Sequence, residues 1–174
     1  PRAIDEPSPL PSGPTMTLPA NADAWIEDRA ITSLAVLKDG NLVFEDYFLG
    51  TNPNDLRINW SVSKSYLSAL LGVLVAEGVI PDITAPVTDY APELAGSAYD
   101  GASIKNVLQM SSGVTFDEDY LDQSSDINRM GRVLALGGSM DEFTTGLTET
   151  FAPAGQRMQY VSIDTHVIGM VIRG

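Results

Sequence analysis

Ser61 and Lys64 stand three residues apart at the start of an apolar segment, and these two residue types at this spacing could carry out acyl transfer. On a helix, residues three apart are neighbours, with Cβ atoms about 5 to 6 Å apart. A serine hydroxyl attacks a carbonyl poorly unless a base removes its proton as the bond forms. Burial lowers the pKa of a lysine because it disfavours the charged form, so a lysine on an apolar helix can supply this base. The spacing predicts Ser61 as the nucleophile and Lys64 as its base.

The position of Ser61 at the expected start of a helix adds a second argument. Free backbone N–H groups and the positive end of the helix dipole stabilise a negative charge that develops nearby. Serine is also common at helix starts as a simple cap, so a structural role stays open at this point. Of the three lysines, Lys38, Lys64 and Lys105, only Lys64 completes an S-x-x-K motif.

Tyr160-Val161-Ser162 is the second candidate for chemistry, because it precedes another expected helix. A phenol beside a lysine ammonium has a lowered pKa and can relay protons. Packing is the commoner role of a tyrosine, however, and Tyr66-Leu67-Ser68 repeats the same pattern inside a helix. The tripeptide alone leaves both roles open.

Composition limits the kind of protein that can position these groups. With 174 residues, of which 44% are hydrophobic and 19% charged, the chain is long enough for one globular domain with a core. The net charge of −13 opposes binding to nucleic acid or to anionic lipid. Polar residues interrupt the longest apolar run, 67–80, so a membrane span is not expected. The absence of cysteine excludes disulfides and thiolate metal sites without indicating a compartment, and a soluble protein of the cytoplasm or an exported one fits equally.

The first sixty residues predict an arm and a hairpin. Residues 1–30 hold six of the prolines within their first 19 positions, which indicates an extended arm that wraps a surface, followed by a short helix at 21–29. Residues 31–37 and 42–48 are rich in β-branched and aromatic types, and an Asp-Gly turn lies between them. We therefore expect 31–60 to form the first hairpin of an α/β domain.

Residues 61–174 predict a mostly helical domain. Leucines at helical spacing and a stop at Gly78 predict a central, buried helix over 61–77. Three prolines predict that 81–100 is a surface connection with one short helical piece near 87–90. The remaining expected elements are helices near 103–110, 127–136, 139 or 141 onward, and 162–173, with an acidic loop over 117–126.

Three segments taken together resemble a known family. They are Trp60-Ser61-Val62-Ser63-Lys64-Ser65, the Met110-Ser111-Ser112-Gly113 turn, and Phe151-Ala152-Pro153-Ala154-Gly155 continuing through Tyr160-Val161-Ser162 to Gly169. In this order they resemble the serine β-lactamase-like and penicillin-binding-protein-like hydrolases, particularly the class C-like branch that contains esterases and 6-aminohexanoate-dimer hydrolase. The resemblance covers about 31–174. It implies an α/β fold of the α+β type, with an antiparallel sheet, a helical domain and no cofactor.

The resemblance also implies roles for individual residues. Ser61 would be acylated by a small-molecule ester or amide, Lys64 would activate it, and Tyr160 would relay a proton to the leaving group. The N–H of Ser61 would form half of the oxyanion hole. Residues expected to contact substrate are Trp60, Ser112, Tyr120 and Ser162, although Trp60 and Tyr120 fit a core position equally well.

Two departures from the family pattern modify this expectation. Ser162 stands where β-lactamases usually carry asparagine, which moves the expected substrate from β-lactams towards esters or linear amides. A third family motif, Lys or His before a pair of small residues, does not occur after Tyr160. We therefore expect this chain to be the N-terminal portion of the fold. Its expected partner is the C-terminal remainder of the same protein, possibly as a separate chain, which would also pair the open edges of the hairpin.

Several alternatives stay open. The same fold could be a β-lactamase or a D-Ala-D-Ala peptidase, or a scaffold that binds peptides without turnover. The single histidine, His166, could form a Ser-His-Asp arrangement with Asp164 or another carboxylate, although a structural role is commoner for such a histidine. No histidine and carboxylate spacing predicts a metal site. The acidic loop is expected to be a solvated surface, or otherwise a lid that attracts a cationic substrate.

Overall fold

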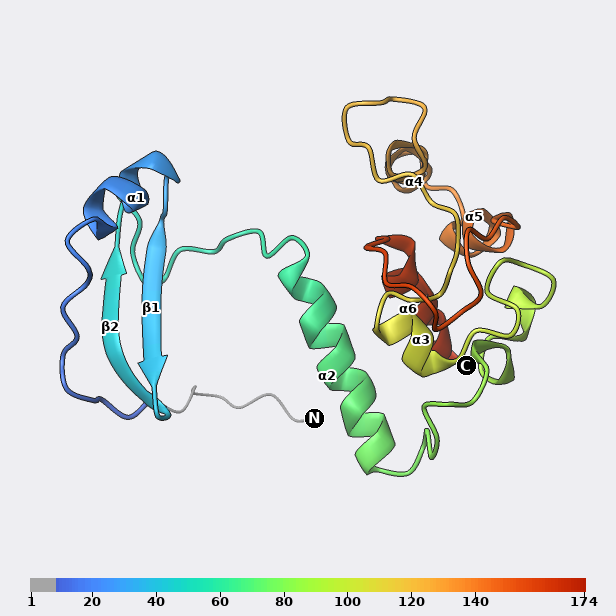
Figure 1. The fold of residues 1–174 in the computed structure, drawn as a ribbon, viewed down its shortest axis with the longest axis horizontal. Helices are drawn as coiled ribbons and strands as arrows, with labels where there is room; N and C mark the ends of the chain where they lie inside the picture. Colours follow the sequence, from blue (N-terminus) through green and yellow to red (C-terminus); the bar gives the residue numbers. More distant parts are fainter. Residues whose placement is uncertain (1–8) are drawn as a thin grey trace. The chain divides into compact units, whose positions relative to one another are not determined.

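The computed structural model describes residues 9–174, which form two compact units that divide between Ile58 and Asn59 (Figure 1). Residues 1–8 of the expected arm lie outside the described residues. The first unit contains α1 (Ala22–Asp28), β1 (Ser33–Lys38) and β2 (Asn41–Tyr47). The second contains α2 (Val62–Ala76), the 3-10 helices η1 (Val87–Asp89) and η2 (Pro92–Leu94), α3 (Ile104–Leu108), α4 (Asp126–Ala135), α5 (Met140–Thr145) and α6 (Ile163–Arg173).

The hairpin of the first unit forms where the sequence predicts it. β1 and β2 pair antiparallel from Ser33 opposite Tyr47 to Lys38 opposite Asn41. Asp39 and Gly40 both adopt positive φ, 53° and 78°, the backbone that a two-residue hairpin turn requires. The Asp-Gly signal therefore predicts both the hairpin and its turn.

The arm pairs with β2, so this strand edge is less open than expected. The Leu42 N–H donates to the Pro11 carbonyl oxygen, and the Leu42 carbonyl oxygen accepts from the Gly13 N–H at 2.9 Å. The Met16 N–H adds a bond of 2.8 Å to the Val43 carbonyl oxygen. A side chain at Gly13 would lie 2.9 Å from Val43, so the close approach of the arm requires glycine.

The centre of the second unit is α6, and not α2 as the sequence suggested. Most of α6 is buried, whereas Leu71 is the only buried residue of α2. Both α2 and α3 pack against α6. Apolar side chains occur on all sides of α2. One side of the helix packs within this unit, while Val62 and Tyr66 on α2 remain exposed. An apolar run thus predicted the helix correctly but overestimated its burial.

The connection between α2 and α3 is also different from its prediction. Val87, Leu94 and Tyr99 are fully buried, so residues 81–100 are part of the core and not a surface connection. Prolines and turns indicated irregular backbone, which is correct. The apolar side chains between them point inward, and the Val87 N–H and the Ile104 N–H bond across to the carbonyl oxygens of Ala102 and Ala85.

Serine caps fix three of the helix starts in the second unit. Ser103 accepts from the Asn106 N–H and forms a capping box with that residue. Ser125 and Ser139 accept in the same way at the starts of α4 and α5. None of the helices in residues 9–174 has both the length and the apolar character needed to cross a membrane.

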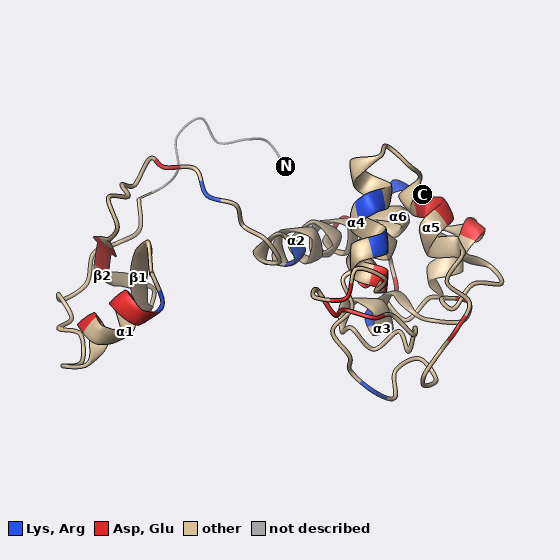
Figure 2. Ribbon diagram, turned by 90° about the horizontal axis from the view of Figure 1, so that it is seen from above, with Lys and Arg blue, Asp and Glu red and all other residues tan. Residues whose placement is uncertain are grey.

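The charged residues are unevenly distributed within the second unit. In the ribbon of Figure 2, α4 has blue positions for basic residues and carries Arg129 and Arg132, whereas α5 has red positions for acidic residues and carries Asp141 and Glu142. Within residues 9–174, no group of three or more histidine and carboxylate side chains is arranged to hold a metal ion.

Candidate active site

Three side chains of the second unit meet at the hydroxyl of Ser61. Lys64 Nζ donates to Ser61 Oγ at 3.0 Å, and the Tyr160 hydroxyl donates to the same oxygen at 2.7 Å. Lys64 Nζ also lies 5.2 Å from the centre of the Tyr160 ring. Ser61 and Tyr160 are 99 residues apart in the chain, so folding and not local sequence brings them together.

The start of α2 positions the serine. Ser61 is the N-cap residue, and the first turn closes with the Lys64 N–H bonded to the Ser61 carbonyl oxygen at 3.0 Å. The Ser61 side chain makes no capping bond, so its hydroxyl is available to Lys64 and Tyr160. The preceding residue, Trp60, has a φ of 43°, a left-handed backbone that is unfavourable for a bulky residue. This tight turn precedes the candidate nucleophile directly.

The Met110 to Gly113 turn holds the segment that carries Tyr160. The Met110 carbonyl oxygen accepts from the Gln159 N–H at 2.8 Å, and the Gly113 carbonyl oxygen accepts from the Phe151 N–H at 2.9 Å. Gly113 has a φ of 83°, and a Cβ at this residue would overlap the Ala152 carbonyl oxygen. Glycine is therefore required where the turn and the segment touch.

Neighbouring groups adjust the acidity of Tyr160. Partial burial raises its pKa, but hydrogen bonds with Lys64 and Ser61 and the positive charge of Lys64 outweigh this effect. The net result is a lowered pKa for the Tyr160 phenol, although the negative charge of Glu118 opposes it. The Tyr160 phenol therefore ionises more readily, and donates its proton more readily, than an isolated tyrosine would.

Glu118 lies beside this cluster and binds the residue that replaces the family asparagine. Its carboxylate accepts from the backbone N–H of Ser162 and, at 3.3 Å, from the Ser162 hydroxyl. Tyr120 lies close to the same pair: burial raises its pKa, a hydrogen bond with Ser162 lowers it, and the charge of Glu118 raises it. A carboxylate is thus fixed at the N-terminal end of α6, where its charge acts on Tyr160.

The other acidic residues of this loop bond mainly within the loop. Asp117 accepts from the Asp119 N–H, Asp119 from the Leu121 N–H, and Asp122 from Ser124. Their carboxylates are exposed, which agrees with the expected solvated surface. Glu118 and Asp126 are the half-buried exceptions.

A second, buried polar network is centred on Asp164 in the first turn of α6. Asp164 Oδ1 accepts from the Tyr99 hydroxyl at 2.8 Å and from the Ser112 hydroxyl at 2.9 Å. Burial raises the pKa of Asp164 to about 7, the two hydroxyls oppose this effect, and the charge of Glu118 adds to it. Only 2% of Ser112 is exposed, so its side chain supports the Asp164 network and does not face the Ser61 hydroxyl.

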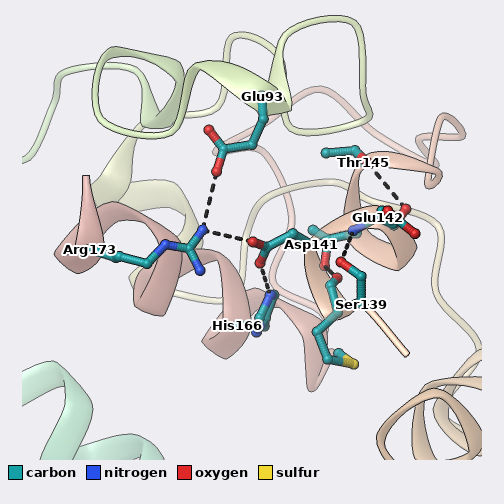
Figure 3. Close-up of polar contacts among 9 residues, drawn as sticks. Glu93, Ser139, Asp141, Glu142, Thr145, His166 and Arg173 are labelled. Atoms are coloured by element: carbon teal, nitrogen blue, oxygen red, sulfur yellow. Dashed lines mark hydrogen bonds and ion pairs between the residues drawn. The ribbon is translucent and has the colours of Figure 1, made fainter. Parts of the chain in front are cut away.

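The histidine network is separate from the serine. His166 Nε2 lies 2.8 Å from Asp141 Oδ1, while Arg173 contacts Asp141 at 2.8 Å and Glu93 at 3.3 Å (Figure 3). The alternative Ser-His-Asp arrangement is therefore not assembled among residues 9–174, because His166 pairs with Asp141 while Ser61 bonds Lys64 and Tyr160.

The structure thus gathers most of the residues singled out from the sequence. Trp60 and Tyr120 are exposed, at 81% and 64%, so neither is a core residue in this chain. The roles of two residues, Glu118 and Asp164, were not predicted. Glu118 was one of several acidic loop residues without a distinguishing signal, whereas Asp164 had one, because a carboxylate between Ile163 and Val167 interrupts the apolar face of a helix.

Comparison with known proteins places this geometry in a family. The sequence model of the beta-lactamase family matches residues 22–174. The chain belongs to the beta-lactamase family.

Two proteins that are similar to this chain carry the name 6-aminohexanoate-dimer hydrolase. The 6-aminohexanoate-dimer hydrolase of Paenarthrobacter ureafaciens is 34% identical over 154 residues, which are 84% of this chain and 38% of that protein. A structure from Bacillus anthracis, provisionally named 6-aminohexanoate-dimer hydrolase, superposes with a TM-score of 0.72 at 19% identity, over 95% of this chain and 48% of that one.

Superposition on a solved structure also shows the fold of this chain. A class C beta lactamase superposes with a TM-score of 0.63 at 21% identity, over 86% of this chain and 41% of that one. The fold is therefore of the β-lactamase and transpeptidase type, as the sequence resemblance implied, and this chain spans less than half the length of these relatives.

Proposed function

We propose that this chain carries the nucleophile of a serine hydrolase that cleaves ester or linear amide bonds through an acyl-enzyme on Ser61. One observation supports this function above the others: Ser61 Oγ receives hydrogen bonds from both Lys64 Nζ and the Tyr160 hydroxyl. A hydroxyl between an amine and a phenol can lose its proton to the free amine, or to the phenol once that group is ionised, as it attacks a carbonyl.

In the first step Ser61 Oγ bonds to the substrate carbonyl carbon while its proton passes to Lys64. Tyr160 then donates a proton to the departing alcohol or amine, and its lowered pKa favours that donation. The Lys64 ammonium, which hydrogen-bonds Tyr160, then returns the proton to the phenolate oxygen. In the second step water attacks the ester on Ser61, and the same groups move its proton in the reverse direction.

The developing oxyanion needs hydrogen-bond donors. The N–H of Ser61 at the start of α2 is one candidate, because helix N-termini stabilise negative charge. Trp60, exposed next to it, and Tyr120 and Ser162 near Tyr160 would contact the acyl or leaving group.

Two features favour esters and linear amides over β-lactams. Ser162, held by Glu118, occupies the position of the asparagine that β-lactamases usually carry. The relative at 34% identity is named for a 6-aminohexanoate dimer, which is not a β-lactam. β-Lactamase or D-Ala-D-Ala peptidase activity is the second candidate function, because a class C beta lactamase shares the fold.

We further propose that a C-terminal segment of the same protein completes the site, either in one chain or as a separate one. Exposed apolar side chains at the start of α2, Trp60, Val62 and Tyr66, support this because such residues usually meet a partner surface. The relative at 34% identity is more than twice as long and contains residues that this chain does not match.

The test is covalent labelling of the complete protein with a fluorophosphonate, together with turnover of p-nitrophenyl acetate. We expect an adduct on Ser61, and loss of labelling and turnover in Ser61→Ala. Ser63→Ala, two residues along the same helix, is the matched control and should lose activity only in part. Lys64→Ala should fall nearly as far as Ser61→Ala, because members of one catalytic unit are strongly non-additive.

The outcomes separate the candidate functions. Equal losses in Ser61→Ala and Ser63→Ala would contradict the assignment of the nucleophile. Well-folded protein that forms no adduct would favour the third alternative, a peptide-binding scaffold of the same fold. Faster turnover of a cephalosporin than of the ester would favour a β-lactamase.

A further inference from the structure

Asp164 is a buried carboxyl group with one oxygen that lacks a partner. The residue is 1% exposed in the first turn of α6. Its Oδ1 accepts from Tyr99 and Ser112, whereas Oδ2 has no hydrogen-bond partner within the described residues. A buried polar atom without a partner is costly, so water or a function is expected at Oδ2.

A small cavity connects this carboxyl group with the candidate base. The cavity has a volume of about 40 Å³ and lies between α2, α3 and α6. Its polar lining consists of Lys64, Ser68, Asp164 and Thr165, and apolar side chains form the rest. One water needs about 10 to 15 Å³ of such volume and two to four polar partners, so this cavity can hold ordered water.

Lys64 therefore borders two features at once. Its Nζ donates to Ser61 Oγ in the candidate active site, and its side chain lines the cavity that also contains Asp164. No direct ion pair joins Lys64 and Asp164 among the described residues, so a contact between them requires water.

We propose that Asp164 is a positioning residue for the acyl-transfer reaction, which holds Lys64 through water in this cavity and couples the charge of Lys64 to its own. This inference rests on the proposed function, because it assigns Lys64 as the base. An anionic Asp164 stabilises the ammonium that forms when Lys64 takes the Ser61 proton. A neutral Asp164 favours the free amine.

Several titratable or polar groups surround the Asp164 carboxyl group. The groups that face Asp164 are Tyr99, Ser112, Glu118 and, across the cavity, Lys64. Burial raises the Asp164 pKa to about 7, which places its titration in the neutral range. A change of charge at Asp164 would therefore affect Lys64 at the pH at which most hydrolases work.

The first experiment needs no activity. In the complete protein, the Asp164 carboxyl carbon is followed by ¹³C NMR against pH, with Asp164→Asn to assign the signal. We expect the titration midpoint of Asp164 to rise by about half a pH unit or more in Lys64→Met, because the positive charge of the Lys64 ammonium no longer stabilises the Asp164 anion. Lys105→Met removes an exposed cation of α3 and is the matched control, which should leave the midpoint in place. An unchanged midpoint in Lys64→Met would overturn the inference.

The second experiment follows kcat/KM for a p-nitrophenyl ester against pH. Asp164→Asn keeps an oxygen for Tyr99 and Ser112 but removes the charge. We expect kcat/KM to fall about tenfold with little change in KM, and the acidic limb to move to lower pH, since the neutral amine is then favoured. Asp141→Asn, at an aspartate that contacts α6 elsewhere, should leave the profile unchanged. A fall without movement of the acidic limb would indicate a purely structural role.

The two experiments separate this inference from the proposed function. Wild-type protein that neither labels nor turns over ester would end the proposed function, while the NMR midpoint would still report the coupling. Turnover with no response of the Asp164 midpoint to Lys64→Met would overturn the role of Asp164 alone. If Asp164→Asn does not fold, the Lys64→Met titration with its Lys105→Met control decides the question, and the signal is then assigned by its perturbation in Ser112→Ala.

Discussion

Asp164 lies in α6 and Asp141 contacts α6, and their surroundings shift the pKa values of these two aspartates in opposite directions. Asp164, in the first turn, is buried and bonds to the neutral hydroxyls of Tyr99 and Ser112. Asp141, from α5, is partly exposed and bonds to His166 and Arg173 (Figure 3). Burial raises the pKa of Asp164 to about 7, whereas hydrogen bonds from His166 and Arg173 lower the pKa of Asp141.

The difference shows what a carboxylate needs in order to remain charged inside a fold. Two good hydrogen bonds from hydroxyls do not offset the loss of water around Asp164. Hydrogen bonds from His166 and from the Arg173 guanidinium keep Asp141 ionised at a partly exposed position, where little burial opposes them. The candidate active site thus lies near a carboxyl group that can change its charge at neutral pH, and the network of His166 and Arg173 has an aspartate that keeps its charge.

The largest expected effect is on the pH dependence of stability at the buried aspartate. Asp164 is more easily protonated in the folded state than in the unfolded state, so its contribution is complete below about pH 4 and is lost as pH rises through about 7. The displacement of its pKa corresponds to about 4 kcal/mol at 1.36 kcal/mol per pH unit. Asp164→Asn should therefore flatten the free energy of unfolding between pH 4 and 7, measured by urea denaturation. An equally steep dependence in the variant would contradict the burial argument.

The next effect tests the Met110 to Gly113 turn, which positions Ser112 for its hydrogen bond to Asp164. Gly113→Ala should destabilise the protein by about 3 kcal/mol or more, because it combines a positive φ with overlap on the Ala152 carbonyl oxygen. Gly101→Ala is the matched control, since Gly101 has a φ of 84° but open space around its Cα. It should lose only about 1 to 2 kcal/mol, the cost of the left-handed backbone. Similar losses on thermal denaturation would show that the overlap relaxes without cost.

A smaller effect isolates one hydroxyl of the buried network. Tyr99→Phe removes a hydrogen bond that favours the anion of Asp164, so the Asp164 pKa should rise further, with a loss of about 1 to 3 kcal/mol at neutral pH. ¹³C NMR titration of the Asp164 carboxyl carbon measures this change. A lower midpoint in the variant would mean that the phenol mainly excludes water from Asp164.

The smallest effect is expected at the exposed aspartate. The pKa of Asp141 is lowered on folding, so its stabilisation is complete above about pH 4 and is lost as pH falls through the lowered value. His166→Gln should cost less than about 1 kcal/mol, because the pair is about a third exposed and solvent screens it. Urea denaturation at a series of pH values should show the difference between variant and wild type above about pH 4, and the difference should disappear as pH falls below that value. Added salt should reduce it, and a salt-independent loss would point to packing of His166 instead.

The contrast between the two aspartates also explains what the sequence could predict. Helix starts depend on local chemistry, so Ser103 and Ser139 marked them correctly. The S-x-x-K spacing placed Ser61 beside Lys64 for the same local reason. Tyr160 joined them only through the family resemblance, because no local rule brings together residues so far apart in the chain.

Long-range packing decided the parts that the sequence predicted poorly. Residues 81–100 contain prolines and turns typical of a surface, yet Leu94 and Tyr99 fill the core. The charge state of Asp164 depends on Tyr99 and Ser112, which are 65 and 52 residues away from it. Glu118 could not be separated from its acidic neighbours until its bond to Ser162 was visible.

The distance along the chain between Ser61 and Tyr160 has a consequence during synthesis. Ser61 leaves the ribosome 99 residues before Tyr160, and closing so long a loop has an entropic cost that later packing must offset. A nascent chain therefore carries the serine and its lysine for several seconds, at typical rates of elongation, without the phenol. The hydroxyl acquires its complete set of partners only when α6 begins to form, so a half-made chain does not present the finished site to the esters and amides around it.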